Sequence, residues 1–513
     1  MKFSMRALQW LIVVALAIFA VVILTRWSPS ESSQIVYVTL TPSSTVPPTV
    51  VPTWTVTPVP EVEPSPTASP TRTPLPTRTP VPLPTTAPPP LVLPDPPPLH
   101  EPEGEPLNTT LPFTLTGPQG IRWVTDTVPM AQIAQPPRTV NILLLGSDRR
   151  PGEAVGRTDV LMIVSIFPDL PGVSMISIPR DFYAWIPGWG YDKINTAYLR
   201  ASRVNYEGGG PALLRDTIEY NFGIPIHAYA MVDFASFRSI VDTLGGVDVV
   251  VECSFHDTYP DDESPTGQTD IDLLPGIHHL DGKHALWYSR SRWNTSDYDR
   301  HRRQQQVIRA MYTQALNQNL LPRVPELWDA YQQWVETDLR LNDLLSLGGV
   351  AARLDTRNIK SRFIRGAALI EAWTAPNGGF VLVPNRQSLQ AFMEEAAQPP
   401  VTSRASQRAY RVEVLNGSGN SGWGHVAAYR LGLEGFEVVD VQPAEGAPRT
   451  TIVDFTTTGK GSPIYTLMRL YKRQDGDVQA QPTEGSPIDF RVILGWDYNP
   501  CDAAGPPMWQ PAP

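Results

Sequence analysis

Proline is concentrated in one early part of this chain, which limits where a globular fold can form. Of the 55 prolines in 513 residues, 24 lie between Pro29 and Pro106. This Pro-, Thr-, Ser- and Val-rich segment cannot bury enough apolar surface to offset the entropy of ordering, and its prolines favour polyproline II. At about 3.1 Å per residue it reaches on the order of 200 Å or more. We predict an extended Pro/Thr-rich linker over residues 28–138.

An uncharged stretch of nineteen residues, 7–25, precedes this linker. As a helix it spans roughly 28 Å, close to the hydrocarbon thickness of a bilayer. Lys2 and Arg6 come before it and Arg26 follows it, which favours an amino terminus on the inner side of the membrane. A cleaved signal peptide is the alternative, but "LTRWSPSES" offers no A-x-A-like cleavage site. We predict a single-pass anchor over residues 1–27, with the globular domains outside the cytoplasm.

Charge and cysteine content narrow the function classes. The net charge of −10 argues against nucleic acid as the main partner, because phosphate-backbone binding needs a basic surface over much of a domain. A local basic cluster can still bind a small anion.

The two cysteines, Cys253 and Cys501, have no metal-ligand spacing. Two interpretations stay open: one buried thiol and one tail thiol, or an interdomain disulfide, which an extracytoplasmic location permits.

Short apolar runs alternate with helical patterns from about residue 139. "TVNILLLGSD", "DVLMIVSIFP" and "VSMISIPRD" each read as a buried strand with a polar turn, and "GGPALLRDTIEYNFG" has helical spacing. Strands and helices joined by short turns indicate an α/β domain, a layered sheet flanked by helices, over residues 139–395. After a linker at 396–409, a smaller α/β domain is expected at 410–499, followed by a disordered tail at 500–513.

Polar and charged side chains gather where the predicted strands end. Ligands of open α/β sheets bind beyond the carboxyl ends of the strands. The candidates from the first four strand ends and loops are Gly146, Asp148, Arg150, Arg157, Asp159, Pro179, Arg180, Asp181, Lys193 and Asn195. The stretch "YSRSRWNTSDYDRHRRQQQVI" at 288–308 adds Arg290, Arg292, Asp297, Arg300, Arg303, Gln304 and Gln305.

Periodicity predicts how this basic stretch is arranged. "ALWYSRSR" alternates, so we expect a strand from which Arg290 and Arg292 point the same way. Thr295 or Ser296 is the expected N-cap of the helix that follows. One face of that helix carries Asp297, Arg300, Arg303 or Gln304, and Val307. Arginines from both elements can then converge on one anion.

Arginines beside paired carboxylates suggest a diphosphate bound with a divalent cation. The planar guanidinium fork suits phosphate oxygens, and carboxylates suit Mg²⁺. The alternative is a solvated helix face that neutralises itself, with ion pairs worth a few tenths of a kcal/mol each. For Asp297 and Arg300 alone we favour that alternative, but not for the whole set at several strand ends.

Several motifs in order give this chain a family resemblance. "NILLLGSDRR", "GRTDVLMIVS", "ISIPRD", "KINTAY", "LGGVDV" and "LDGKHALWYSRSR…DYDRHRRQQ" resemble the LytR-CpsA-Psr family, over about residues 139–395. "VLNGSG" and "VILGWD" within 410–497 resemble the LytR C-terminal domain. The resemblance implies membrane-anchored enzymes that move a phosphate-linked glycopolymer from a polyprenyl diphosphate carrier to a peptidoglycan sugar hydroxyl. It also implies an apolar tunnel for the prenyl chain between sheet and helices.

The resemblance assigns roles by position. Asp148 and Asp159 match carboxylates associated with Mg²⁺. The residues that match diphosphate-contacting or site-organising groups are Arg150, Arg157, Arg180, Arg290, Arg292, Arg300, Arg303 and Gln304. The residues expected to carry the catalysis are Asp148, Asp159, Arg180, Asp181, Arg290 and Arg303. Asp181 and the two metal-associated acids are the candidate general bases.

Two features depart from the family motifs. Arg149 and Arg302 are additional charges, and Arg302 is expected to face away from Arg300 and Arg303 on the helix. The acidic insert at 256–272 favours a solvated hairpin over a further metal loop.

Two alternative functions stay open. One is a non-catalytic protein that binds or regulates wall polymer, and the other is a polyprenyl diphosphate hydrolase.

Overall fold

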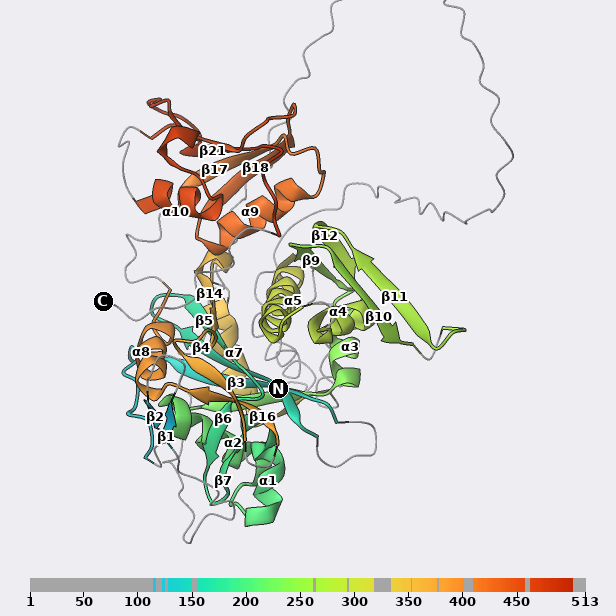
Figure 1. Cartoon of the computed structure of the whole chain (residues 1–513), viewed down its shortest axis with the longest axis vertical. Coiled ribbons are helices and arrows are strands. Elements are labelled where there is room, and N and C mark those ends of the chain that lie inside the picture. The colour runs from blue at the N-terminus through green and yellow to red at the C-terminus, as the bar shows by residue number, and fades with distance from the viewer. Residues whose placement is uncertain are drawn as a thin grey trace, which may run out of the picture. The chain divides into compact units, whose positions relative to one another are not determined.

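The structure is a computed structural model of the whole chain (Figure 1). It describes residues 114–116, 122–124, 128–149, 156–261, 264–292, 295–317, 334–351, 353–375, 378–400, 409–456 and 462–501. No helix within these ranges is both long and apolar enough to cross a bilayer. The predicted anchor and most of the predicted linker lie outside the described residues.

A six-stranded mixed sheet forms the centre of the larger domain, in the order β13-β8-β3-β4-β5-β14. Neighbouring strands are parallel in the pairs β3–β8 and β5–β14, and antiparallel in β3–β4, β4–β5 and β8–β13. The bounds are β3 Val140–Ser147, β4 Thr158–Phe167, β5 Gly172–Ile178, β8 Ala228–Val232, β13 Glu336–Thr337 and β14 Ile359–Phe363. The strands expected from the apolar runs at 139–181 are confirmed.

Helices cover both faces of this sheet (Figure 1). Successive side chains of a strand point to opposite faces, so Ile142 and Leu144 join one core while Leu143 and Leu145 join the other. The first core includes helices α3 Phe234–Thr243, α4 Gly282–Arg290, α5 Asp297–Asn317 and α7 Leu341–Ala351. The second core includes α1 Ala197–Val204, α2 Gly209–Phe222 and α8 Arg386–Ala396. The predicted layered α/β class is confirmed.

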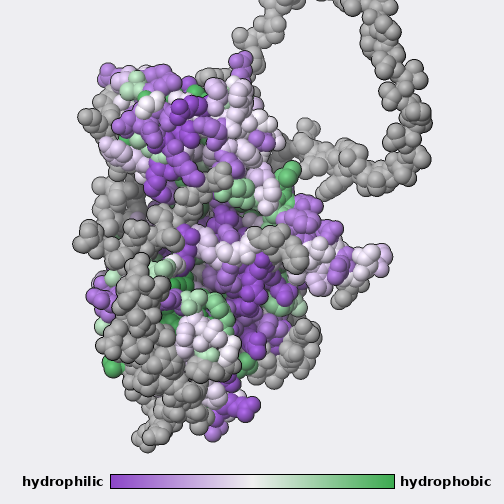
Figure 2. All heavy atoms as spheres, viewed as in Figure 1, coloured by the Kyte–Doolittle hydropathy of each residue, from purple (hydrophilic) through white to green (hydrophobic). Residues whose placement is uncertain are grey.

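Two-stranded sheets and short 3-10 turns complete the larger domain. They are β1 Thr114–Thr116 with β2 Arg122–Val124, β6 Tyr183–Ile186 with β7 Gly190–Lys193, β9 Val247–Val251 with β12 Gly276–Leu280, β10 Phe255–Pro260 with β11 Gln268–Leu273, β15 Ile370–Thr374 with β16 Phe380–Pro384, and the turns η3 Ile194–Thr196 and η5 Thr356–Asn358. The acidic insert is the antiparallel hairpin β10–β11, and Figure 2 shows its surface as largely hydrophilic. Within the described residues no group of three or more His, Cys, Asp or Glu is arranged to hold a metal ion.

The C-terminal domain is built on a five-stranded sheet of order β18-β17-β21-β19-β20. Its elements are β17 Arg411–Asn416, α9 Trp423–Leu433, β18 Glu437–Pro443, β19 Thr451–Asp454, α10 Ser462–Leu470, η7 Asp475–Asp477, β20 Val478–Ala480 and β21 Phe490–Leu494. The predicted strand, helix, strand and closing strand are β17, α9, β18 and β21. The elements between β18 and β21 were not predicted.

Part of the predicted linker belongs to the folded domain. Met130 and Ile133 are buried in the second core, and their backbone N–H groups donate to the carbonyls of Tyr220 and Gly223. Ordered structure therefore begins before residue 139. This segment has no periodic apolar pattern, because the buried side chains among residues 128–138 are the isolated Met130 and Ile133.

Candidate functional site

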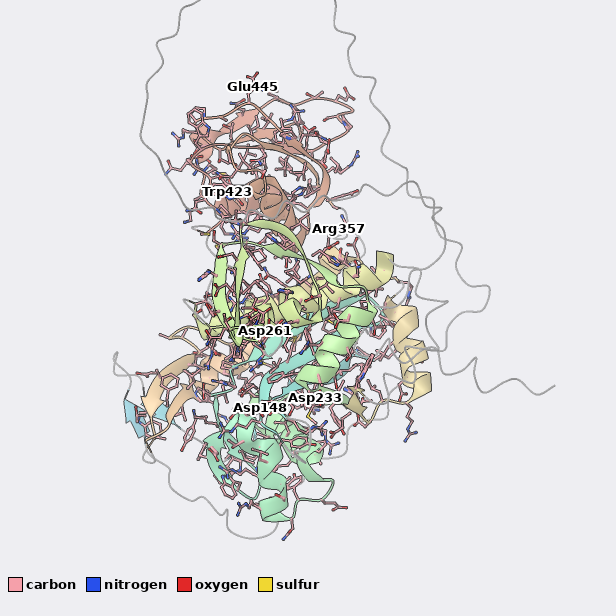
Figure 3. All side chains as sticks on the ribbon, turned by 90° about the vertical axis from the view of Figure 1, so that its right-hand side faces the viewer. Asp148, Asp233, Asp261, Arg357, Trp423 and Glu445 are labelled. Atoms are coloured by element: carbon pink, nitrogen blue, oxygen red, sulfur yellow. The ribbon has the colours of Figure 1, made fainter. Side chains whose placement is uncertain are left out.

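One edge of the central sheet gathers most of the predicted site. Strands β3, β5 and β8 run in the same direction and β4 runs against them. Asp148 after β3, Arg180 after β5 and Asp233 after β8 therefore lie at the edge where β4 begins, and Asp159 is the second residue of β4. Figure 3 labels Asp148 and Asp233 at this end of the sheet. The structure gathers the residues chosen by the strand-end rule at one edge, although β4 contributes its beginning rather than its end.

A network of charges holds the centre of this edge. Asp159 Oδ2 accepts a hydrogen bond from Arg180 Nη1 at 2.8 Å, and its Oδ1 accepts one from Asn195 Nδ2 at 3.2 Å. Asp181 Oδ1 accepts from Lys193 Nζ at 2.6 Å, and its Oδ2 lies 3.6 Å from Arg180 Nε. The structure thus brings together five predicted residues from the start of β4, the loop after β5, and the end of β7 with the turn η3.

Asp148 lies on the neighbouring loop between β3 and β4. Its backbone N–H donates to the Arg157 carbonyl, and its Oδ1 accepts from the Arg157 backbone N–H at 2.6 Å. A Cβ at Gly156 would stand 2.5 Å from the Arg149 nitrogen, so only glycine lets the chain return this close to the end of β3. Asp148 is partly exposed and makes no ion pair with any described residue. The side chain of Arg157 is exposed. Arg150 lies outside the described residues.

The predicted strand at Arg290 and Arg292 is wrong. Residues Gly282–Arg290 form helix α4, whose N-cap Asp281 accepts from the His284 N–H. The alternation of "ALWYSRSR" is outweighed by this cap and by the helical spacing of the buried residues Ala285, Tyr288 and Ser289. Arg290 ends the helix and stacks on the Phe234 ring at 3.9 Å, next to Asp233.

Helix α5 begins where the sequence predicted. Ser296 is the N-cap: its Oγ accepts from the Asp299 N–H, and the Asp299 carboxylate accepts from the Ser296 N–H. Asp297 lies 2.9 Å from Arg300 Nη2 and 3.8 Å from Arg292 Nη1. The first turn of α5 therefore adds the Asp297 carboxylate and the Arg300 guanidinium group to the site, and the segment before it adds Arg292.

Arg300 is buried with donors that make no hydrogen bond. It is 4% exposed, and its Nη2 is ion-paired with Asp297 Oδ1 at 2.9 Å. Neither Nε nor Nη2 makes a hydrogen bond within the described residues. The same holds for Arg180 Nε. Burial lowers the pKa of Arg300 from its usual value, Asp297 opposes this, and Arg180 and Arg292 add to it. Buried cationic donors that make no hydrogen bond with the protein are suited to an anion that supplies acceptor oxygens.

The other predicted residues of α5 support the site from within. Arg303 is 3% exposed and donates to the carbonyls of Tyr288 and Ser291, so it ties the end of α4 to α5. Gln304 donates to the Ser289 carbonyl. Gln305 turns to the sheet, where it donates to Ser177 Oγ at 2.8 Å and does not reach the site edge. The family resemblance implies that Arg303 either contacts the diphosphate or organises the site, and these contacts fit the organising role.

An apolar pocket opens beside this charged edge. It encloses an empty volume of about 790 Å³, including its open mouth, between strands β3, β4 and β8 and helices α3, α4 and α5. Most of its lining is apolar, and its polar members are Asp233, Ser289, Arg290 and Gln304. Its walls include Gly146 and Val160, which are paired in register. Gly146 lies two residues before Asp148, and Val160 directly follows Asp159. The pocket therefore extends from the charged edge into the first core.

Sequence reasoning missed some residues of this edge. Asp233 caps α3 by accepting from the Ser236 N–H, and Arg149 lies 3.5 Å from it. Asp233 directly follows the strand 228–232, so the rule that ligands bind beyond the carboxyl ends of strands would have identified it as a site candidate. His301 is buried beside Asp297, and only the helical spacing i to i+4 pointed to it.

His301 makes the stability of the domain depend on pH. Burial lowers its pKa to about 4, against a usual value of 6.5. The unfolded chain therefore binds a proton before the folded chain does, and stability is lost as the pH falls from 6.5 toward 4. The free energy of unfolding should fall between pH 7.5 and pH 5, and we expect this fall to be about 2 kcal/mol smaller in His301→Gln than in the unsubstituted protein. Urea unfolding at both pH values measures it.

The exposed His256 gives a matched control for this prediction. His256→Gln should leave the pH dependence as it is in the unsubstituted protein. Equal pH dependence in the His301→Gln variant and in the unsubstituted protein would contradict a neutral buried imidazole.

Two family models match the chain. The model of the LytR_cpsA_psr family matches residues 124–398, which is more than half of the 513 residues. The chain belongs to the LytR-CpsA-Psr family. A second model, described as LytR cell envelope-related transcriptional attenuator, matches residues 409–498. The resemblance seen in the sequence motifs is confirmed for both parts.

Curated relatives match this LytR-CpsA-Psr protein over part of its length. The polyisoprenyl-teichoic acid–peptidoglycan teichoic acid transferase TagU of Oceanobacillus iheyensis is 39% identical over 211 residues, covering 40% of this chain and 61% of the relative. Regulatory protein MsrR of Staphylococcus aureus is 30% identical over 263 residues, covering 50% of this chain and 75% of the relative. The chain thus spans less than two thirds of the TagU relative.

Solved structures show similarity over half of this chain. The crystal structure of TagV from B. subtilis has 27% sequence identity and a TM-score of 0.41, covering 50% of this chain and 95% of that one. The structure of YwtF (TagT) with bound octaprenyl pyrophosphate lipid has 26% identity and a TM-score of 0.36, covering 50% and 88%.

Proposed function

We propose that this protein is a membrane-anchored, extracytoplasmic transferase. It moves a phosphate-linked glycopolymer from a polyprenyl diphosphate carrier to a sugar hydroxyl of peptidoglycan. The observation that carries the proposal is the continuity of an apolar pocket with a charged edge at which the buried Arg180 Nε and Arg300 Nε and Nη2 make no hydrogen bond within the described residues. This arrangement is complementary to an amphiphile with a long apolar chain and a diphosphate head. The relatives TagU and TagV are named teichoic acid transferases, which supports the same class.

The proposed reaction is attack of an acceptor hydroxyl on the phosphorus next to the sugar. A new P–O bond forms to the acceptor, the bridging P–O bond breaks, and polyprenyl monophosphate leaves while the hydroxyl proton passes to a base. Arg180 and Arg300 would bind the non-bridging oxygens, and Arg290 would bind the head at the pocket mouth. Positioning and charge neutralisation supply most of the catalysis in phosphoryl transfer.

The carboxylates of this edge fit a magnesium ion. Mg²⁺ is usually held by one or two carboxylates together with substrate phosphates and water, so a cluster of three protein acids is not needed. Asp148, partly exposed and without an ion pair among the described residues, and Asp159 would hold it. When bound, Mg²⁺ would neutralise charge on the diphosphate.

The transfer proposal is tested directly with the full chain purified in detergent. Mass spectrometry should find a co-purified polyprenyl phosphate lipid, and incubation with lipid-linked polymer should attach polymer to added peptidoglycan fragments. Release of free phosphorylated polymer at equal rates with and without acceptor would indicate a hydrolase. Binding of lipid-linked polymer without release or transfer would indicate a binding or regulatory protein.

Filling the apolar pocket should separate recognition of the tail from recognition of the head. Ile308 lines the pocket, and Ile308→Trp is expected to weaken binding of a long-chain prenyl diphosphate by about tenfold or more. Affinity for inorganic diphosphate, which leaves the pocket empty, should stay within about twofold in the same calorimetric titrations.

Ile277→Trp is the matched control for the pocket variant, because Ile277 is 51% exposed. It should leave both affinities unchanged. An equal loss of long-chain and inorganic diphosphate binding in Ile308→Trp would argue against a tail in this pocket.

A further inference from the structure

A buried carboxylate outside the proposed site joins the two domains. Glu252 follows β9 directly and is 6% exposed. Its Oε1 accepts from Gln306 Nε2 at 2.6 Å and lies 2.8 Å from Arg302 Nη1, while its Oε2 accepts from Arg430 Nε at 2.7 Å. Arg302 and Gln306 belong to α5, and Arg430 belongs to α9 of the C-terminal domain.

The protonation state of this carboxylate suits a fixed link. Burial alone would raise the pKa of Glu252, but the guanidinium groups of Arg302 and Arg430 outweigh it and hold that pKa below its usual value. Glu252 is therefore a carboxylate that receives charge-assisted hydrogen bonds from both domains. Ionic groups buried in this way can fix the register of packed elements.

Helix α5 is shared by the diphosphate site and the domain interface. Arg300 faces the charged edge, while Arg302 and Gln306, four residues apart, face Glu252. The prediction that Arg302 faces away from the site residues is confirmed, and this extra arginine acquires a structural partner. A rotation or shift of α5 that breaks these bonds would also move Arg300.

Other contacts close the same interface around α9. Lys360 Nζ donates to the Leu433 carbonyl at 2.6 Å, and Tyr429 shares a side-chain hydrogen bond with Gln306. The N-terminus of α9 approaches the β11–β12 turn so closely that a Cβ at Gly422 would collide with the Pro275 carbonyl oxygen. The C-terminal domain thus contacts α5, β12 and β14 through specific polar bonds and a close backbone approach.

We propose that Glu252 is a positioning residue through which the C-terminal domain holds α5, and with it Arg300, in the arrangement that binds diphosphate. This role rests on the proposed function and assigns a task to the C-terminal domain. Without the Arg430 bond, α5 keeps its own bonds to Glu252, but Glu252 loses the bond that anchors it to α9 of the C-terminal domain.

The test uses Arg430→Met in the full chain. Arg302 and Gln306 still satisfy Glu252 in this variant, so no buried charge is left unpaired. We expect the affinity for inorganic diphosphate with Mg²⁺, measured by calorimetry, to fall about tenfold, as for an ordinary coupling between sites. Arg430→Lys should restore part of the affinity, because the lysine keeps a cation beside Glu252.

Arg491→Met is the matched control in the same domain, since Arg491 pairs with Glu413 at 2.5 Å within the C-terminal sheet. It should leave the affinity unchanged. Unchanged affinity in Arg430→Met would overturn the positioning role while leaving the proposed function intact. Failure of the unsubstituted chain to bind diphosphate would overturn both.

The two cysteines report domain docking in the same samples. Cys253 adjoins Glu252, Cys501 adjoins Pro500, whose carbonyl accepts from Arg430, and the two thiols are in hydrogen-bond contact. Oxidised glutathione should join them, with two protein thiols oxidised to one disulfide and glutathione disulfide reduced to two thiols. Mass spectrometry of non-reduced peptides should show slower joining in Arg430→Met and an unchanged rate in Arg491→Met. An unchanged rate together with unchanged affinity in Arg430→Met would also overturn the proposal.

Discussion

Arg300→Met is expected to lower the turnover of lipid-linked substrate by about 10²–10³-fold, the usual cost of removing one preorganised donor to a developing anion. Its Nε and Nη2 atoms make no hydrogen bond in the described part of the chain, although Nη2 is ion-paired with Asp297. Phosphate oxygens placed beside Nε and Nη2 would accept hydrogen bonds from them without any rearrangement of the protein. The measurement is the rate of transfer to peptidoglycan fragments with purified full-length variants.

The same variant should keep its stability. Burial lowers the pKa of Arg300, which means that its charge is unfavourably placed before an anion binds. Methionine has a similar length and no charge, so the midpoint of thermal unfolding should stay close to that of the unsubstituted protein. Diphosphate should raise this midpoint in the unsubstituted protein and raise it much less in Arg300→Met.

Arg138→Met is the control, because Arg138 is a half-exposed arginine paired with Asp169 at 2.8 Å away from the site edge. It should change neither turnover nor the diphosphate-induced shift. Turnover within about threefold of wild type for Arg300→Met would rule out this guanidinium as an essential phosphate ligand.

Strand ends were readable from the sequence because a buried strand is a short apolar run followed by a polar turn. Asp148, Asp159, Arg180 and Asp181 were found in this way, and they lie at one sheet edge. The error at Arg290 has a definite cause. Alternation over eight residues fits a strand, but an Asp281 cap and helical burial fit a helix, and side-chain packing decided between them.

The sequence could not show which arginines of α5 are placed to contact an anion and which hold neighbouring elements in position. Arg300 and Arg303 have the same residue type on neighbouring turns of one helix, yet one has unsatisfied donors and the other bonds to backbone carbonyls. That difference depends on where the end of α4 lies. Glu252 was missed for a similar reason, because its partners Arg302 and Arg430 are 50 and 178 residues away in the chain.

Asp159→Asn is the second change with a large expected effect. The carboxylate of Asp159 is held by Arg180 and Asn195 at the proposed diphosphate site. Asparagine keeps the shape of this side chain and removes the charge that a divalent cation requires. We expect the Mg²⁺-dependent part of diphosphate affinity to be largely lost and turnover to fall about 10²-fold.

The measurement that separates this role from a general loss of activity is binding rather than turnover. Calorimetric titration of diphosphate at several Mg²⁺ concentrations should show a steep dependence in the unsubstituted chain and a weak one in Asp159→Asn. Asp169→Asn, which alters an exposed pair with Arg138, should behave like the unsubstituted chain. If Asp159→Asn retained the full dependence on Mg²⁺, Asp159 would be a residue that orients Arg180 rather than a metal ligand, and its substitution should then be compensated by higher diphosphate concentration.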